Sequence, residues 1–312
     1  MKQYYVLFKN HDNGMRLYNS LKSKNIKATI APTPRVASKS CGISLLINKD
    51  DIEKIREIVA SEEIDIIDIG STASKVVALG DENIEFVLPT GWSSKETVDE
   101  IKNILLSYEI DVCDDNTKVV ATGYGRISVD FADKIITEIT CHGKGGTEIA
   151  KGDCTIIDIG GQDTKVIIVE NNFVSDFIMN DKCSAGTGKF IEVMANRLGV
   201  TIDELFDMAK KGETVKISSL CTVFAESEVI SFIGKGAKRE DIAAGVVDSV
   251  ASKVATLCNK KKLSNKIIIT GGISHNEYFA NLLSKKLKKK VEYSKEGRYA
   301  GALGAALLAK EL

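Results

Sequence analysis

Residues 66–77 read IIDIGSTASKVV, and residues 156–167 read IIDIGGQDTKVI. Seven of the twelve positions are identical between the two stretches, which begin 90 residues apart. Each stretch is an apolar run, a turn rich in small polar residues and a second apolar run, which is the pattern of a β-hairpin. P-loops and Rossmann turns open a helix after their glycines, so both are disfavoured. A duplicated hairpin predicts two similar α/β lobes that face one another across a cleft.

The turns of both hairpins carry groups suited to a nucleotide. Backbone N–H groups in such turns surround phosphate oxygens, and carboxylates hold Mg²⁺, mostly through water. The first hairpin contributes the candidate catalytic residue Asp68 and the candidate nucleotide contacts Gly70, Ser71, Thr72, Ala73, Ser74 and Lys75. The second contributes the candidate catalytic residues Asp158, Gln162 and Asp163 and the candidate nucleotide contacts Gly160, Gly161 and Gln162. We expect Gln162 to orient the attacking water.

A further candidate contact lies late in the chain. Gly271 and Gly272 follow an apolar strand pattern at 266–270. Backbone without side chains can approach a flat base or a ribose closely, so we expect these glycines, with Asn276, to contact adenosine. An ordinary tight turn is the alternative for any one of these segments taken alone.

Two of the seven cysteines stand just before helix patterns. Cys183 precedes the pattern at 189–198, and Cys221 precedes the one at 224–232. Helix N-termini favour thiolates, so both cysteines are candidate ligands of an anionic iron–sulfur cluster. A [4Fe–4S] cubane takes four thiolates, and a two-fold dimer would supply two from each subunit. From spacing alone, burial in the core is the commoner fate of such thiols.

The hairpins and the diglycine resemble the nucleotide-binding fold that sugar kinases, acetate kinase, actin and heat-shock chaperones share. Within it, MNDKCSAGTGKF at 179–190 and SSLCTVFAESEVIS at 218–231 resemble the activators of 2-hydroxyacyl-CoA dehydratases and the ATPase subunits of benzoyl-CoA reductases. ATGYGR at 121–126 and YAGALGAALLA at 299–309 match the same family, in family order with the two hairpins.

The resemblance implies an α/β ATPase of two lobes that couples hydrolysis to electron transfer. Cys183 and Cys221 would ligate one oxygen-sensitive [4Fe–4S] cluster shared by a homodimer, and ATP with Mg²⁺ would bind between the lobes, with Glu226 as a candidate ribose contact. The acceptor would be a 2-hydroxyacyl-CoA dehydratase-type iron–sulfur enzyme, and ferredoxin or flavodoxin would supply electrons. The alternatives are a small-molecule kinase of the same fold and a nucleotide-gated module without enzymatic activity. The motif at 123–126 has no assigned role beyond a turn.

The pattern strand, helix, strand, strand, helix predicts a small α+β domain at 1–63, ahead of the ATPase domain at 64–312. The first domain resembles Se/S carrier-like proteins, and its Cys41 is either a plain exposed thiol or a carrier thiol. Because the activator family begins near the first hairpin, this extra N-terminal domain leaves the identity of the acceptor enzyme open. The expected lobes of the second domain are 64–150 together with 300–312, and 151–299.

Composition restricts the partners. Lys and Arg total 42 and Asp and Glu total 43, a formal net charge of −1, which offers no footprint for nucleic acid. No apolar run approaches the roughly 20 residues that span a bilayer, and the N-terminus lacks a signal-peptide pattern. We therefore expect a cytoplasmic protein that binds neither membrane nor nucleic acid, with its cysteines reduced.

Overall fold

The computed structural model describes residues 4–6, 18, 21–22, 24, 26–32, 43–47, 51, 73–80, 83–90, 94–112, 114, 117–181, 183–217 and 221–312. The chain forms two compact units, Met1–Ile64 and Asp65–Leu312. Several residues singled out above lie outside the described part of the chain: Cys41, Asp68, Gly70, Ser71 and Thr72.

The N-terminal unit contains a three-stranded antiparallel sheet. Its strands are β1 (Tyr4–Val6), β2 (Ala28–Pro32) and β3 (Ile43–Ile47), and β3 lies between the other two. Leu21 and Leu45 are its fully buried apolar side chains among the described residues. The three strands agree with the predicted pattern, and the helices predicted in this unit lie largely outside the described residues.

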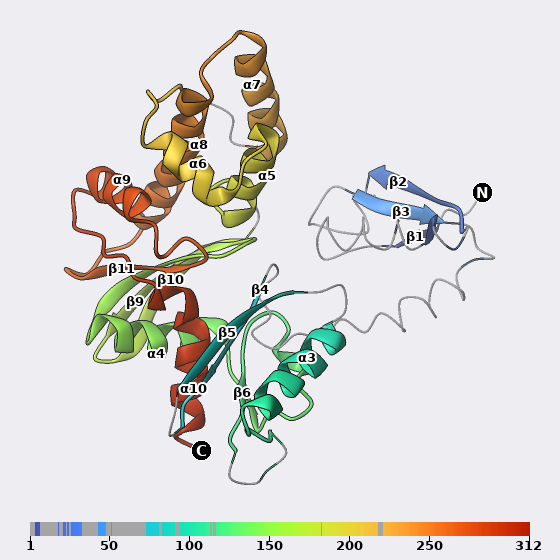
Figure 1. The fold of residues 1–312 in the computed structure, drawn as a ribbon, viewed down its shortest axis with the longest axis vertical. Helices are drawn as coiled ribbons and strands as arrows, with labels where there is room; N and C mark the ends of the chain where they lie inside the picture. Colours follow the sequence, from blue (N-terminus) through green and yellow to red (C-terminus); the bar gives the residue numbers. More distant parts are fainter. Residues whose placement is uncertain are drawn as a thin grey trace. The chain divides into compact units, whose positions relative to one another are not determined.

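A four-stranded sheet organises the C-terminal unit, with strand order β10-β9-β8-β11. Three of its strands, β9, β10 and β11, are labelled in Figure 1. β8 and β9 form an antiparallel hairpin, which confirms the second predicted hairpin, and β11 runs parallel to β8. In this register Asp158 pairs with Lys165 across the hairpin and with Thr270 on β11. The bounds are β8 (Cys154–Ile159), β9 (Thr164–Glu170), β10 (Phe173–Asn180) and β11 (Ile267–Gly271).

Helices cover both faces of this sheet, because its central strands are apolar at nearly every position. On β8 the side chain of Ile156 packs on one face against α4, while Ile157 packs on the other face in the core shared with α5 and α8. The helices are α3 (Ser94–Ser107), α4 (Glu138–Ala150), α5 (Gly188–Leu198), α6 (Ile202–Ala209), α7 (Thr222–Gly234), α8 (Arg239–Cys258), α9 (Glu277–Leu287) and α10 (Ala300–Ala309). Figure 1 shows α5 to α8 gathered together, with α4 and α10 side by side below the sheet.

The first hairpin is described only from its second strand onward. This strand, β4 (Ala73–Ala78), pairs antiparallel with β5 (Ile84–Pro89) and contacts α10. A short parallel pair, β6 (Val120–Ala121) and β7 (Lys134–Ile135), precedes α4. Within the described part of the chain, no helix combines the length and apolar character needed to cross a membrane.

Glycines allow α4 and α10 to pack backbone against backbone. A Cβ atom on Gly304 would lie 1.8 Å from the carbonyl oxygen of Cys141, and one on Gly145 would lie 1.9 Å from that of Ala300. The close approach of α4 and α10 at these two glycines therefore requires the absence of a side chain.

Replacing Gly304 tests this packing. Alanine is favoured over glycine in helices by about 1 kcal/mol, but the clash in Gly304→Ala should outweigh that gain and lower the free energy of unfolding by about 2 kcal/mol. Gly234→Ala is the matched control, because a Cβ atom there meets nothing within 4 Å. Urea unfolding followed by circular dichroism measures both, and equal stability of the two variants would contradict the packing.

Candidate functional site

A cluster of buried charges lies at the carboxyl end of β8. Asp158 is 2 % exposed, and its Oδ1 atom accepts a hydrogen bond from Thr270 Oγ1 at 3.1 Å and lies 3.3 Å from His142 Nε2. Burial by itself would raise the pKa of Asp158, but His142 and Lys165 outweigh it and hold that pKa far below its usual range. Asp158 is therefore a fixed, ionised carboxylate.

Lys165 lies among three carboxylates. Its Nζ atom is 2.7 Å from Asp163 Oδ1, 3.1 Å from Glu138 Oε1 and 3.5 Å from Asp158 Oδ2, and its side chain is 3 % exposed. Burial would lower the pKa of Lys165, but the three carboxylates outweigh that effect and raise it above its usual range. The ammonium group is thus charged at any physiological pH.

Helix α4 supplies the other two members of the cluster. Thr137 caps α4 by accepting from the backbone N–H of Thr140, which makes Glu138 the first helical residue and sets His142 one turn later on the same face. His142 Nδ1 lies 3.2 Å from the Glu138 carbonyl oxygen. Burial would lower the pKa of His142, but Asp158 raises it to about 9. Ligand atoms of Glu138, His142 and Asp158 all lie within 4.8 Å of one another, close enough to hold a metal ion.

The segment without an assigned role, 123–126, reaches the same cluster. Tyr124 donates from its hydroxyl to Asp163 Oδ2 at 3.2 Å, and Arg126 Nη1 donates to the Gly123 carbonyl at 2.8 Å. Burial and the charge of Asp163 raise the pKa of Tyr124 to about 12. Both side chains, with Glu138 and Lys165, line a pocket of about 150 Å³.

The turn of the β8–β9 hairpin is bonded to the start of α5. The backbone N–H groups of Gly188 and Lys189 donate to the carbonyl oxygens of Gly160 and Gly161 at 2.9 and 2.8 Å. Thr164 Oγ1 donates to the Gly186 carbonyl at 2.7 Å. The turn therefore holds the N-terminus of α5 in place.

The diglycine lies against the same strand end. Gly271 has a φ of 89°, and a Cβ atom there would lie 2.3 Å from the Ile159 carbonyl oxygen, so a side chain does not fit. Nothing lies within 4 Å of a Cβ atom on Gly272. Asn276 caps α9 by accepting from the Phe279 N–H. This arrangement leaves open space beside Gly272 next to the charged cluster.

The described part of the first hairpin approaches the second. On β4, Lys75 is near enough to Asp158 to contribute to the lowering of the pKa of Asp158. Ser74 is buried and its Oγ lies 3.4 Å from Thr90 Oγ1. Ala73, Ser74 and Lys75 thus lie in the strand that follows the first turn, while that turn itself is outside the described residues.

Cys183 and Cys221 are exposed, unlike Cys141, Cys154 and Cys258, which are buried. Ser184 and Thr222, the residues directly after the two exposed cysteines, share a hydrogen bond of 2.7 Å between their hydroxyl oxygens. Cys221 is the N-cap residue of α7, and the segment after Cys183 leads into α5. The first turn of neither helix contains an acidic residue, so the local field suits an anionic group. The tertiary structure thus brings the two cysteine segments together.

Glu226, the predicted ribose contact, is the ion-pair partner of Arg197. Arg197 lies in the last turn of α5, and Glu226 lies in α7. This pair joins the two helices that follow Cys183 and Cys221.

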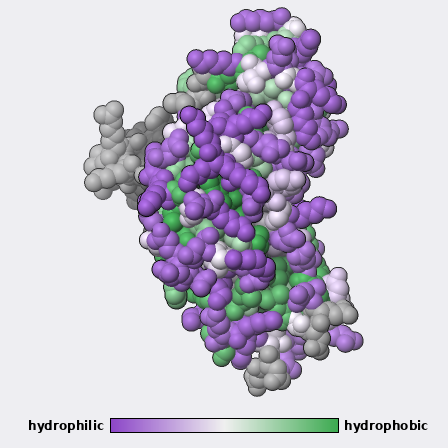
Figure 2. All heavy atoms as spheres, turned by 90° about the vertical axis from the view of Figure 1, so that its left-hand side faces the viewer, coloured by the Kyte–Doolittle hydropathy of each residue, from purple (hydrophilic) through white to green (hydrophobic). Residues whose placement is uncertain are grey.

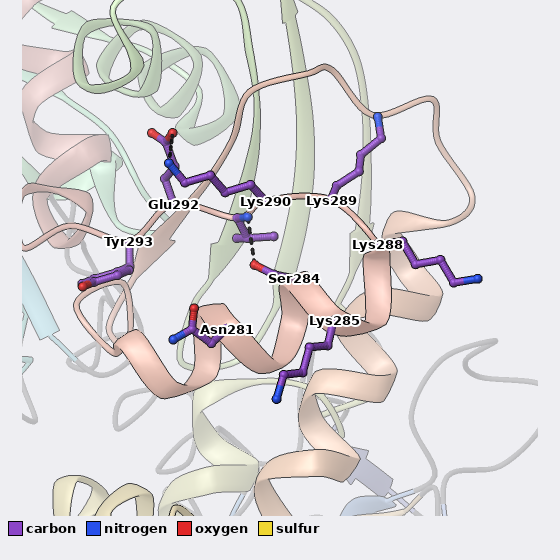
Figure 3. Close-up of a pocket in the computed structure, with 9 residues that line it drawn as sticks. Asn281, Ser284, Lys285, Lys288, Lys289, Lys290, Glu292 and Tyr293 are labelled. Carbon is purple, nitrogen blue, oxygen red and sulfur yellow. Dashed lines mark hydrogen bonds and ion pairs between the residues drawn. The ribbon is translucent and has the colours of Figure 1, made fainter.

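A second hollow in the described part of the chain lies elsewhere and contains none of the predicted site residues. It measures about 730 Å³ and is lined by the last turns of α9 and the segment after it (Figure 3). Lys289 donates to the carbonyl oxygens of Leu263 and Ser264, and Lys290 pairs with Glu292. Lys285 and Lys288 point in different directions (Figure 3). The surface on the α9 side of the molecule is mostly hydrophilic (Figure 2). Because these ammonium groups diverge, the hollow does not form a convergent anion site.

Comparison with known proteins identifies the family. The model of the BadF/BadG/BcrA/BcrD ATPase family matches residues 67–309. This chain belongs to that ATPase family. A Se/S carrier protein-like family model matches residues 3–70. The resemblance stated from the motifs is confirmed for both parts of the chain.

The matches between this ATPase and its relatives extend over nearly the whole length of the relatives. The (R)-2-hydroxyglutaryl-CoA dehydratase activating ATPase of Acidaminococcus fermentans is 43% identical over 248 residues, 78% of this chain and 95% of that protein. The 2-hydroxyisocaproyl-CoA dehydratase activator of Clostridioides difficile is 40% identical over 78% of this chain and 93% of its own. Its solved structure, with bound ADPNP, superposes with a TM-score of 0.72 at 38% identity, covering 78% of this chain and 94% of that chain.

The fold prediction is also confirmed. A ROK family glucokinase from Streptomyces griseus, 15% identical, superposes with a TM-score of 0.51 over 79% of this chain and 98% of its own, which shows the shared sugar-kinase-like fold.

Four residues of the charged cluster were not among the predicted site residues: Tyr124, Glu138, His142 and Lys165. Lys165 had a visible signal, since it occupies the position of Lys75 in the repeat. Tyr124 lies in a motif that was noticed but given no role. Glu138 and His142 precede the second hairpin on a helix that the repeat does not include, so nothing in the motif pointed to them.

Thiol reactivity tests the assignment of the cysteines. In cluster-free protein at pH 8, Cys183 and Cys221 should react with iodoacetamide on the order of tenfold or more faster than Cys154 and Cys258. Burial raises the pKa of Cys154 to about 11 and that of Cys258 to about 12, so both stay thiols. Peptide mass spectrometry over time measures each site, and equal labelling of the four cysteines would contradict the exposure pattern.

Proposed function

We propose that this ATPase donates single electrons, driven by ATP hydrolysis, to a partner iron–sulfur enzyme of the 2-hydroxyacyl-CoA dehydratase type. The observation that carries the proposal is the direct bonding between the Gly160–Gly161 turn and the start of α5, five residues after Cys183. The names of two relatives, activators of 2-hydroxyglutaryl-CoA and 2-hydroxyisocaproyl-CoA dehydratases, support the class of acceptor.

ATP is proposed to bind at the hairpin turns. Asp158 and Asp163 provide the oxygen ligands that Mg²⁺ prefers, and Gln162 lies in the turn between them, where it would orient water. The backbone N–H groups of the two turns would hold the phosphates, and the open side of Gly272 would receive adenosine. The contacts proposed from the first hairpin are Asp68, Gly70, Ser71, Thr72, Ala73, Ser74 and Lys75.

Cys183 and Cys221 are the proposed cluster ligands. Both are exposed, their following residues are hydrogen-bonded to one another, and both precede helix N-termini, which suits two thiolates on one anionic group. A [4Fe–4S] cluster held there by two subunits supplies one-electron transfer. Because each chain offers two of four ligands, the proposal requires a homodimer.

Exposed apolar side chains of α7 support the dimer. Val223 and Phe224 directly follow Cys221 and are 65% and 66% exposed, and Ile230 and Ile233 on the same helix are also exposed. Exposed apolar side chains gathered on one helix mark an interaction surface. The second subunit would bury the residues nearest Cys221 when it contributes its own pair of cysteines.

Hydrolysis would reach the cysteines through the backbone. A change in the β8–β9 turn on loss of the γ-phosphate acts on Gly188 and Lys189, whose N–H groups the turn carbonyls hold, and Thr164 transmits the same change to Gly186. The hydroxyl contact between Ser184 and Thr222 would then pass this change on to the start of α7. Shifts of packed helices are a common way in which a nucleotide alters a distant site.

The remaining assignments complete the proposal. Residues 1–63 form the Se/S carrier-like domain, and residues 64–312 form the ATPase domain, with lobes at 64–150 plus 300–312 and at 151–299. Ferredoxin or flavodoxin would supply electrons in the cytoplasm. Glu226 would leave Arg197 in order to contact ribose.

The function is tested with a purified 2-hydroxyacyl-CoA dehydratase in the absence of oxygen. With dithionite and ATP, the reconstituted chain should convert inactive dehydratase to active enzyme, and omission of ATP or replacement by ADPNP should abolish activation. ATP turnover without any activation of dehydratases would contradict the proposed acceptor class. Phosphorylation of a small molecule by iron-free protein would point to a kinase.

Removing a cluster ligand should remove the cluster. Cys183→Ser, after anaerobic reconstitution with iron and sulfide, should lose the EPR signal of the dithionite-reduced protein, because a dimer then offers two thiolates rather than four. Cys258→Ala is the control, since that thiol is buried. Iron content and dimer mass are measured alongside, and wild-type iron content in Cys183→Ser would contradict the assignment.

Removing the central carboxylate should stop hydrolysis. Asp158→Asn should lower the ATPase rate by about a hundredfold, because an amide is a weaker ligand for Mg²⁺ and leaves Lys165 and His142 less compensated. Asp153→Asn is the matched control, an exposed aspartate that accepts from the backbone N–H groups of Asn171 and Asn172. Phosphate release measures both variants, and equal rates would contradict the assignment.

A further inference from the structure

The ammonium group of Lys165 lies where a cation site is expected. Glu138 and Asp158 are two members of the group of three residues close enough to hold a metal ion, and Lys165 Nζ already contacts both, at 3.1 and 3.5 Å. It also contacts Asp163 at 2.7 Å, the other carboxylate proposed for Mg²⁺. One ammonium group thus forms ion pairs with all three carboxylates of the cluster.

The charges show that two cations cannot share this place. Glu138, Asp158 and Asp163 offer carboxylate oxygens, and the Lys165 ammonium already lies within 3.5 Å of one oxygen of each. A divalent ion bound to the same oxygens directly, rather than through water, would lie about 2–2.5 Å from them. The Lys165 ammonium would then stand a few ångströms from the ion in a site shielded from water, where like charges repel strongly. Metal binding therefore requires the ammonium to move.

The pocket beside the cluster provides room for that movement. Its volume is about 150 Å³, and Lys165 lines it together with Tyr124, Arg126 and Glu138. The Lys165 side chain is long and flexible, whereas its backbone is fixed in β9 by pairing with Asp158 on β8. A displaced ammonium can therefore turn about its own side-chain bonds without disturbing the strand.

We propose that Lys165 is a positioning residue whose ammonium takes the place of the divalent cation among Glu138, Asp158 and Asp163 until the nucleotide arrives. The nucleotide brings the metal and offers phosphates as new partners for the displaced ammonium. The carboxylates are thereby held in position without bound metal, and the ion is admitted only with its nucleotide. This inference rests on the proposed function, because it assumes that Mg²⁺ and ATP bind at this cluster.

Manganese binding without nucleotide tests the proposal. Mn²⁺ stands in for Mg²⁺ and is titrated anaerobically into the reconstituted protein, with free Mn²⁺ followed by its EPR signal. Lys165→Met keeps the side-chain length and removes the charge, and it should bind one Mn²⁺ per chain at least tenfold more tightly than the wild type. Lys144→Met is the matched control, because Lys144 is an exposed lysine paired with Glu311 on the surface, and it should match the wild type.

A double variant locates the gained site. Lys165→Met combined with Asp158→Asn should return Mn²⁺ affinity to the wild-type value, since Asp158 is the carboxylate at the centre of the cluster. The proposal is overturned if Lys165→Met binds Mn²⁺ no more tightly than the wild type. It is equally overturned if the gained binding survives in the double variant.

A measurement on the wild type tests the proposal even if the variants misfold. Mn²⁺ alone should leave the melting temperature of the wild type unchanged, whereas Mn²⁺ with ADPNP should raise it. A rise with Mn²⁺ alone would overturn the proposal, because the ion would then enter without its nucleotide. ATP hydrolysis and dehydratase activation are measured separately on the wild type. Their failure contradicts the proposed function and leaves the nucleotide-free Mn²⁺ titration interpretable.

Discussion

The hydrogen bonds between the β8–β9 turn and the first turn of α5 tie the two candidate sites together. Gly188 and Lys189 hold the carbonyl oxygens of Gly160 and Gly161, and a Cβ atom on Gly188 would lie 3.1 Å from the Gly160 oxygen. The strands behind the turn are buried almost throughout. The sheet is therefore a closely packed support for the turn.

The buried charges of the cluster need ion-pair and hydrogen-bond partners, and these partners come from several different helices and strands. Isolated ionised groups in an interior are very costly, and they are tolerated when they are paired and hydrogen-bonded. Lys165 pairs with carboxylates from α4, β8 and the hairpin turn, while Thr270 on β11 completes the partners of Asp158. The glycine contact between α4 and α10 holds α4 against the sheet. The site thus depends on backbone packing some distance from its charges.

The charged cluster and the two exposed cysteines have opposite surroundings. The charged cluster is enclosed by the sheet and α4, whereas Cys183 and Cys221 lie at the surface beside exposed apolar residues of α7. A site that polarises phosphates gains from the exclusion of water, since charges interact more strongly in a low dielectric. The proposed electron-donating cysteines lie at the surface, where a partner protein can reach them. The helices α5 and α7, joined by Glu226 and Arg197, connect the two environments.

The family and the second hairpin could be predicted from sequence motifs, and the same motifs marked Cys183 and Cys221 as candidate cluster ligands. These features are local, because a hairpin follows from a run of apolar residues around a turn and the cysteines are marked by their own flanks. Packing in three dimensions was needed to place Glu138, His142 and Tyr124 at Asp158 and Asp163. Tyr124 and Asp163 are 39 positions apart in the chain, and Thr270 and Asp158 are 112 positions apart. Periodicity decides which face of an element is buried, but it does not decide which distant element packs on that face. The partners of a buried charge are therefore set by packing.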